Sequence, residues 1–179
     1  QALGHSVPYL PADHLITVQK GVPNRGPAVL IAAGTGLGEA VLVWADGKLQ
    51  VLPSEGGHAT FGPVTREDLG LATFLRDRYD GHVSWERVVS GQCGFRNIFD
   101  YMRSRGDKVD SALLDQVGDK LDIGAAIIGA ANDGDTTAVT LLNWFARLYG
   151  AEAGNMALKM LARGGVYIGG GIAPRILPY

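Results

Sequence analysis

The chain has 179 residues, 46% of them hydrophobic, which suits one domain with a core of ordinary size. Its formal net charge of -2 and its lack of a basic run argue against a nucleic-acid partner. No apolar run approaches the roughly 20 residues that span a bilayer, so no membrane partner is expected. The single cysteine, Cys93, excludes an internal disulfide framework and a cysteine-rich zinc site. The cytoplasm is therefore the expected location.

The first part of the chain carries weak signals. Residues 1–9, which begin with Gln1, are typical of the end of a helix that prolines interrupt. Residues 14–19 carry a short strand pattern, and residues 21–27 form a loop by composition.

Three strands, which form a β-meander, are predicted next, over residues 28–33, 39–44 and 48–53. Asp46 and Gly47 predict a type I′ turn between the last two. The second strand is apolar at nearly every position over residues 40–45, which predicts burial on both faces of a sheet covered by helices.

A glycine-rich turn, Gly34-Thr35-Gly36-Leu37-Gly38, joins the first two strands. Without Cβ atoms the backbone can approach an anion and aim successive N–H groups at it, and Thr35 adds a hydroxyl. The alternative is an ordinary tight hairpin turn. The turn is neither a Walker A loop nor a Rossmann fingerprint, because no Gly-Lys-Ser/Thr follows and the next element is a strand.

From Thr65 onward the apolar period changes from 2 to 3.6, which predicts helices. They are expected over residues 66–79, 84–89, 95–103, 110–117, 121–132 and 136–162. Thr65 and Asp68 resemble a capping box. In the longest helix, Gly150 and Gly154 have a spacing at which another backbone can pack closely. Its predicted apolar side is Leu141, Leu142, Phe145, Leu148, Tyr149, Met156, Leu158 and Leu161.

A short buried strand over residues 166–168 and a second glycine turn, Gly169-Gly170-Gly171, follow this helix. Pro174 suits the first turn of another helix. Two glycine turns that each follow a strand predict an α/β layered domain that binds its ligand at the strand ends.

Four motifs, in this order, resemble those of bacterial ATP-dependent glucokinases of the actin-like hexokinase superfamily. They are GTGLG at 34–38, EGGH at 55–58, HVSWERVVSG at 82–91 and GGVYIGGGIAPR at 164–175. The resemblance implies an α/β fold of the actin-like ATPase (ribonuclease H-like) type. It also implies transfer of the γ-phosphoryl group of MgATP to the 6-hydroxyl of glucose, at the entry to glycolysis.

The resemblance further implies roles for particular residues. The first glycine turn is expected to contact the β- and γ-phosphates of ATP, and the second turn its adenosine. These nucleotide-binding residues are Gly34, Thr35, Gly36, Gly38, Gly169, Gly170, Gly171 and Ile172. Glucose is expected at Glu55, His58 and Glu86, because carboxylates accept hydroxyl hydrogens and an imidazole donates or accepts. Mg²⁺ is expected to be held mainly through the nucleotide.

The sugar residues also have simpler interpretations. Glu86 lies two residues after a predicted N-cap, Ser84, where an acid complements the helix dipole. Glu55 and His58 would otherwise be an exposed loop pair. A zinc site at this Glu-x-x-His pair is rejected because no cysteine cluster accompanies it, so no metal ligand is assigned. Cys93 is expected to be a small apolar filler. The other histidines are expected at the surface or in packing: His5, His14 and His82.

Two motifs of the family are missing, the Asp-x-Gly-x-Thr phosphate turn and the Asn-Asp-Phe segment that supplies the general base. The base is therefore expected upstream of Gln1, and no catalytic residue is assigned within the chain. Residues 1–26 are expected to lead in from an absent N-terminal domain, and residues 27–179 to be a large domain truncated at its C-terminus. The chain alone is expected to be inactive. The remaining candidate acids are expected to be caps or surface charges: Asp100, Asp133 and Asp135.

Two other functions fit the same fold. One is a non-catalytic sugar- or nucleotide-binding regulator, and the other is a kinase for a different sugar or for a carboxylic acid. An acid-binding kinase would need Arg or Lys beside the EGGH turn, but Ser54 and Ala59 flank it, which favours a neutral polyol. A homodimer is expected from the resemblance, with the helix over residues 136–162 as one candidate surface.

Overall fold

A computed structural model describes residues 2–22 and 24–179 of the protein. Its sheet contains β1 (Ala28–Ala33), β2 (Leu37–Ala45), β3 (Lys48–Ser54) and β4 (Gly165–Gly169) in the order β3-β2-β1-β4. The helices are α1 (Ala2–Ser6), α2 (Arg66–Arg78), α3 (Trp85–Val88), α4 (Gly94–Ser104), α5 (Ser111–Val117), α6 (Gly124–Asn132), α7 (Thr136–Met160) and α8 (Ala173–Ile176). Short 3₁₀ helices cover Val7–Tyr9, Ala12–His14 and, as η3, Gly56–His58.

Two positions of the predicted N-terminal elements lie outside the described residues. They are Gln1, the first residue of the predicted helix end, and Pro23, within the predicted loop over residues 21–27. The general base expected upstream of Gln1 stays a prediction. The rest of the predicted helix end is confirmed, since α1 is followed directly by the 3₁₀ helix over Val7–Tyr9.

The sheet is mixed, which confirms the predicted α/β class. β1 pairs with β2 in antiparallel fashion and with β4 in parallel fashion, so that β1 lies in the middle of the sheet. The turn between β2 and β3 is of the predicted kind, because both Asp46 (φ 51°) and Gly47 (φ 73°) have positive φ. Parallel pairing of β1 with β4 requires a long crossover, and the helices α2 to α7 supply it.

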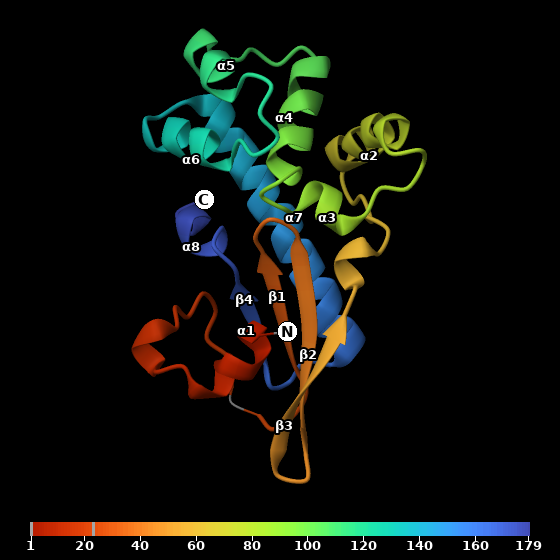
Figure 1. The fold of residues 1–179 in the computed structure, drawn as a ribbon, viewed down its shortest axis with the longest axis vertical. Coiled ribbons are helices and arrows are strands. Elements are labelled where there is room, and N and C mark those ends of the chain that lie inside the picture. The colour runs from red at the N-terminus through yellow and green to blue at the C-terminus, as the bar shows by residue number, and fades with distance from the viewer. Residues whose placement is uncertain (1, 23) are drawn as a thin grey trace.

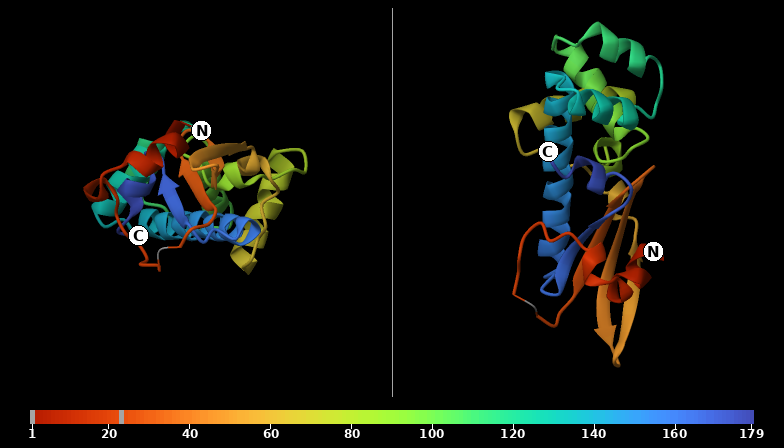
Figure 2. Two further views of the ribbon diagram at one scale, coloured as in Figure 1. Left: turned by 90° about the horizontal axis from the view of Figure 1, so that it is seen from below. Right: turned by 90° about the vertical axis from the view of Figure 1, so that its left-hand side faces the viewer.

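Helix α7 connects the two halves of the molecule. It packs against one face of the sheet and continues into the array formed by α2 to α6 (Figure 1, Figure 2). In the core between them, Phe95 of α4 stacks on Phe145 of α7 with ring centroids 4.2 Å apart, and Ile31 of β1 is fully buried. The acid Asp135 caps α7 by accepting a hydrogen bond from the amide of Ala138 at 2.7 Å.

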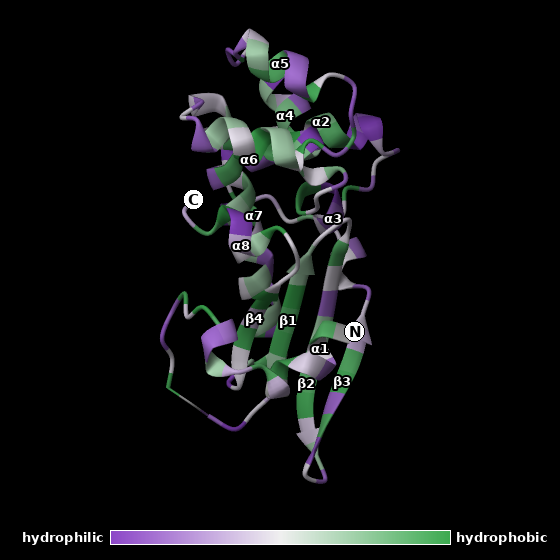
Figure 3. Ribbon diagram, turned by 60° about the vertical axis from the view of Figure 1, so that its left-hand side comes forward, coloured by the Kyte–Doolittle hydropathy of each residue, from purple (hydrophilic) through white to green (hydrophobic). Residues whose placement is uncertain are grey.

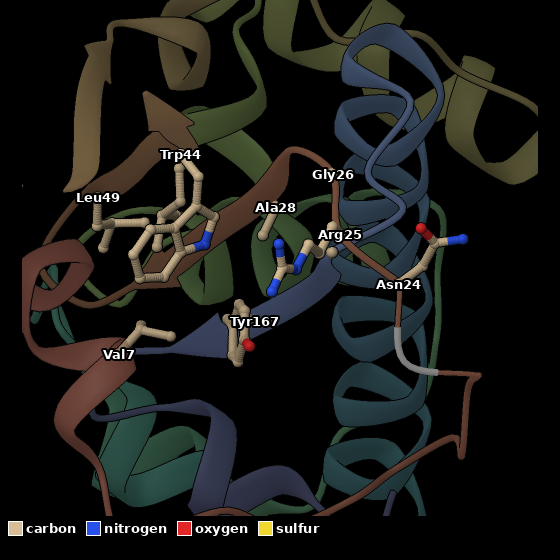
Figure 4. Close-up of a pocket in the computed structure, with 10 residues that line it drawn as sticks. Val7, Asn24, Arg25, Gly26, Ala28, Trp44, Leu49 and Tyr167 are labelled. Carbon is tan, nitrogen blue, oxygen red and sulfur yellow. The ribbon is translucent and has the colours of Figure 1, made fainter. Parts of the chain in front are cut away.

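The other face of the sheet is only partly covered. Ala28, Leu30 and Leu42 form a second, small apolar cluster with Val7, under the N-terminal segment that carries α1. β1 is apolar along its length, whereas apolar and polar residues are mixed along β3 (Figure 3). A hollow on this face has Arg25, Trp44 and Tyr167 in its wall (Figure 4).

Three sequence-based expectations about strands were wrong. Residues 14–19 pair with no strand of the described chain, and Ile16 and Val18 are exposed, because an apolar alternation makes a strand only where it finds a partner. β2 is buried on both faces only at its centre, and Trp44 is 62% exposed. β4 is not buried, because it forms an edge of the sheet, and its Val166 and Ile168 are exposed.

The exposed side of α7 also differs from the expectation. Leu158 and Leu161, predicted on its apolar side, are 82% and 68% exposed. A Cβ at Gly150 or Gly154 would meet no atom within 4 Å, so their spacing brings no other part of the described chain close. The other predicted helices are confirmed, with ends shifted by up to about three residues, which is the usual uncertainty of sequence-based boundaries.

Candidate functional site

The two glycine turns meet at one end of the sheet. Ala32 of β1 is the parallel partner of Gly169 of β4, so both strands deliver their turns to the same edge. A single hollow is lined there by residues of both turns together with Glu86. Its wall is formed by Leu3, Ala32, Gly34, Gly36, Leu37, Gly38, Glu86 and Gly170. The fold thus brings together segments that are more than 130 residues apart in sequence.

In the first glycine turn the carbonyl groups are hydrogen-bonded, whereas two amide groups are left free. The carbonyl oxygen of Gly34 accepts a hydrogen bond from the amide of Gly91 at 2.7 Å, and that of Thr35 accepts one from Gln92 at 3.2 Å. The amide of Gly34 donates to the carbonyl of Gly36 at 2.9 Å. The amides of Thr35 and Gly36 donate to no atom of the described chain. Successive unpaired N–H groups beside a hollow are suited to bind a phosphate oxygen.

Glu86 links this turn to helix α3. Its Oε2 accepts a hydrogen bond from the amide of Leu37 at 2.9 Å, and it lies so close to Gly36 that a Cβ there would collide with the carboxylate. Glycine at position 36 therefore leaves room for the Glu86 carboxylate, which a larger residue would displace. Glu86 therefore lies in the first turn of α3 and also accepts a hydrogen bond from the first residue of β2.

The second turn depends on a left-handed glycine. Gly170 has φ 85°, and a Cβ there would collide with the carbonyl of Ala33. The two strand ends are joined by the buried hydroxyl of Tyr149, which accepts from the amide of Ala33 at 2.8 Å and lies 2.9 Å from the carbonyl oxygen of Gly169. Burial raises the pKa of Tyr149 to about 12, so the hydroxyl keeps its proton to donate.

Glu55 and His58 lie beside the hollow on a separate segment. They belong to the turn at η3 after β3, where Nε2 of His58 is 3.7 Å from Oε2 of Glu55. The side chain of His58 is 62% exposed and that of Glu55 is 91% exposed. Neither lines the hollow. The segment is nevertheless tied to α3, because the amide of Trp85, next to Glu86, donates to the carbonyl of Ala59 at 3.0 Å.

The other predicted nucleotide residues differ in what they expose. Thr35 and Gly171 are exposed, whereas Ile172 is buried in the main core. Gly91 and Tyr149 support the turns but were not predicted as site residues. The Ser-Gly pair at 90–91 signalled only a helix end, and Tyr149 only a position on the core side of its helix.

The remaining candidates lie away from reactive arrangements. Cys93 is half-buried, with Sγ 3.3 Å from Oγ of Ser90. Asp100 forms ion pairs with Arg78 at 2.8 Å and Arg96 at 2.9 Å. The histidines outside the EGGH turn are exposed: His5, His14 and His82. Asp133 is exposed and Asp135 is a helix cap, as predicted.

Over residues 2–22 and 24–179, no three His, Cys, Asp or Glu side chains are grouped so that they could hold a metal ion. In the same part of the chain, no helix combines the length and the apolar character needed to cross a bilayer.

Comparisons with known proteins give the family. The sequence profile of the Glucokinase family matches residues 1–179. A glucokinase from Trichormus variabilis is 42% identical over 191 residues, covering 99% of this chain and 56% of that protein. The crystal structure of a glucokinase from an Antarctic psychrotroph has a TM-score of 0.83 at 33% identity, covering 99% of this chain and 52% of the other. A ROK-family glucokinase from Streptomyces griseus, solved with glucose and AMPPNP, has a TM-score of 0.57 at 22% identity, covering 85% of this chain and 46% of the other.

The α/β fold is therefore one that sugar kinases share. The chain belongs to the glucokinase family. It spans about half the length of the curated relatives it matches.

Proposed function

We propose that the protein containing this chain is an ATP-dependent glucokinase, which transfers the γ-phosphoryl group of ATP to the 6-hydroxyl of glucose. The observation that carries the proposal is the single hollow lined by both glycine turns and Glu86. Phosphoryl transfer requires mainly that two substrates be positioned and their charge neutralised. The hollow offers free backbone donors for phosphate oxygens, and the Glu86 carboxylate beside them is an acceptor for a sugar hydroxyl.

On the nucleotide side, the free amides of Thr35 and Gly36 would donate to phosphate oxygens. Gly34 and Gly38 keep the first turn close to the ligand, and Gly169 to Ile172 would offer their backbone to the adenosine. A magnesium ion would neutralise phosphate charge, and it would be held mainly through the phosphate oxygens of the nucleotide.

On the sugar side, Glu55, His58 and Glu86 would bind hydroxyl groups of glucose. Glu86 has a second role in this arrangement, because its hydrogen bond to Leu37 connects the sugar site to the phosphate turn. The neutral neighbours of the EGGH turn, Ser54 and Ala59, support a neutral hexose as the substrate.

Several finer features belong to the same proposal. Residues 27–179 would be a domain of the actin-like ATPase type, and the protein would act in the cytoplasm at the entry to glycolysis as a homodimer. The lone cysteine agrees with a reducing compartment. None of the site residues of the described chain is proposed as the general base.

The test is calorimetric titration of glucose and of ADP-Mg into the protein at its natural length, beside a coupled assay of glucose 6-phosphate. Glu86→Gln and Glu55→Ala are expected to weaken glucose binding at least about tenfold, the loss of one charge-assisted hydrogen bond, while ADP still binds. Glu67→Gln, an exposed change on α2, is the matched control. Binding of both ligands without turnover would point to a regulator, and ADP binding without glucose binding would point to a kinase for another substrate.

A further inference from the structure

One buried carboxyl has no role in the site described above. Glu39, near the start of β2, is 8% exposed, and its Oε1 is the one buried side-chain nitrogen or oxygen of the described residues that lacks a hydrogen-bond partner. An unpaired buried polar atom costs about 1–3 kcal/mol. A carboxyl that destabilises the fold in this way points to a role outside stability.

The sugar-binding turn rests directly on this carboxyl. Glu39 is the antiparallel partner of Ser54, the last residue of β3, and the chain then turns back over β2. A Cβ at Gly56 would collide with Oε2 of Glu39, and a Cβ at Gly57 would collide with the carbonyl of Leu37. Glycine is therefore needed at position 57, where the obstacle is backbone, and at position 56 a Cβ would have to displace the Glu39 carboxyl.

The groups that face Glu39 favour its uncharged form. From α7 it faces Glu152, which is 1% exposed, and Lys159, whose Nζ lies 4.0 Å from Oε1 of Glu152. Its cross-strand neighbours, Ile31 of β1 and Ser54 of β3, carry no charge. Burial, and then repulsion by Glu152, raise the pKa of Glu39 to about 7, while Lys159 opposes them. Glu55 and His58, the titratable residues of the turn itself, have exposed side chains.

We propose that Glu39 is a positioning residue for the sugar site: its uncharged carboxyl supports the Gly56–His58 turn in the glucose-binding arrangement, and its ionised form displaces that turn. An ionised carboxylate beside Glu152 gains free energy by reaching water, and the exposed η3 turn is what covers it. The inference rests on the proposed function, since it takes Glu55 and His58 to be glucose ligands.

Two consequences can be measured. First, glucose affinity falls as the pH rises through neutrality, because the apparent dissociation constant grows as the competent fraction shrinks. The full effect between pH 6 and pH 8 is about tenfold. Second, by reciprocity glucose binding takes up a proton, about half a proton per site at pH 7.

The experiment compares the wild-type protein at its natural length with Glu39→Gln, which keeps the size and the uncharged state of the side chain. Glucose is titrated calorimetrically at pH 6, 7 and 8 in two buffers of different ionisation enthalpy. Glu39→Gln is expected to bind glucose at pH 8 as tightly as the wild type does at pH 6, and its proton uptake should be smaller. His58 is retained in both proteins, so its own contribution cancels. The matched control is Glu67→Gln, and ADP affinity should not follow the Glu39 substitution.

The inference would be overturned if glucose affinity changed equally with pH in the wild type and in Glu39→Gln, and if both proteins took up the same number of protons on binding. If the wild type binds no glucose at any pH, the proposed function fails, and the positioning role is then tested by NMR alone. The amide shifts of Gly56 and Gly57 should titrate near neutral pH in the wild type and not in Glu39→Gln. Shifts that are flat in the wild type, or that titrate equally in both, would exclude the support of the turn by Glu39.

Discussion

The hydroxyl oxygen of Tyr149 accepts a hydrogen bond from the amide of Ala33 at 2.8 Å, at the last residue before the first glycine turn. The same oxygen lies 2.9 Å from the carbonyl of Gly169, where the second turn begins. One side chain of α7 therefore fixes the distance between the two turns that form the proposed nucleotide site.

Tyr149→Phe should lower the free energy of unfolding by about 1–2 kcal/mol, because the amide of Ala33 would be left buried and unpaired. ADP affinity should fall as well, since the two turns lose their common anchor. Urea unfolding and ADP titration measure the two effects. Tyr9→Phe, at a residue that is 84% exposed, is the control and should change neither. An unchanged ADP affinity in Tyr149→Phe would show that β1 and β4 hold the turns without the hydroxyl.

Gly36→Ala should weaken both ligands at least about tenfold while leaving the fold intact, because the new Cβ displaces the Glu86 carboxylate and frees the Leu37 amide. Calorimetry with glucose and ADP-Mg measures the loss, and far-ultraviolet circular dichroism checks the fold. The control, Gly150→Ala, adds a methyl group on the exposed side of α7, where it meets no atom within 4 Å. That variant should bind normally and gain up to about 1 kcal/mol in stability, the helix preference of alanine over glycine. Loss of glucose binding alone in Gly36→Ala would mean that the first turn does not hold the nucleotide.

Local patterns predicted most of the secondary structure correctly. The capping box at Thr65 and Asp68, the Asp46-Gly47 turn and the cap at Asp135 depend only on neighbouring residues, and all three are present. The α/β class followed from glycine turns placed after apolar strands. The wrong predictions were those that depend on which elements pack together in the fold, such as the exposure of β4 at an edge of the sheet.

The site shows the same division. The glycine turns were recognisable from composition, and their meeting follows from the pairing of β1 with β4. The support given by Tyr149 and Gly91 was not predictable, because the hydrogen bonds to Ala33 and to Gly34 each join residues more than 50 positions apart. The role of Glu39 was not predictable from the sequence either, because charged residues are common near the start of a strand and only the structure shows that this one is buried.

The pH dependence of stability should show the burial of Glu39. Its pKa is raised from the ordinary 4.5 to about 7, so between these values the folded chain keeps a proton that the unfolded chain has lost. Stability should therefore fall as the pH rises through this window and stay lower above it, by up to about 3 kcal/mol. Glu39→Gln removes this contribution, and it should be more stable than the wild type at pH 8 and comparable at pH 4.5. Urea unfolding at both pH values measures the difference, and an equal pH slope in the two proteins would contradict it.

Asp68 should behave in the opposite way. Its side chain is 1% exposed, accepts from the indole nitrogen of Trp144 at 2.8 Å and from the amide of Thr65 at 2.9 Å, and pairs with Arg147. Burial alone would raise the pKa of Asp68, but these hydrogen bonds, first that of Arg147, outweigh burial and hold it well below its usual range. The stabilisation is thus complete above the ordinary pKa and is lost as the pH falls through the lowered one.

Asp68→Asn should lower the free energy of unfolding at pH 7 by about 3 kcal/mol, because the donors of Trp144 and Arg147 lose their charged acceptor. Arg147→Ala should cost less, about 1 kcal/mol, since the Arg147 side chain is 42% exposed and solvent screens the pair. Urea unfolding at pH 7 and pH 3 measures both, and the difference between Asp68→Asn and the wild type should shrink at pH 3. Asp77→Asn, an exposed change on the same helix, is the matched control. If Asp68→Asn and Asp77→Asn lost equal stability, the attachment of α2 to α7 would not depend on this carboxylate.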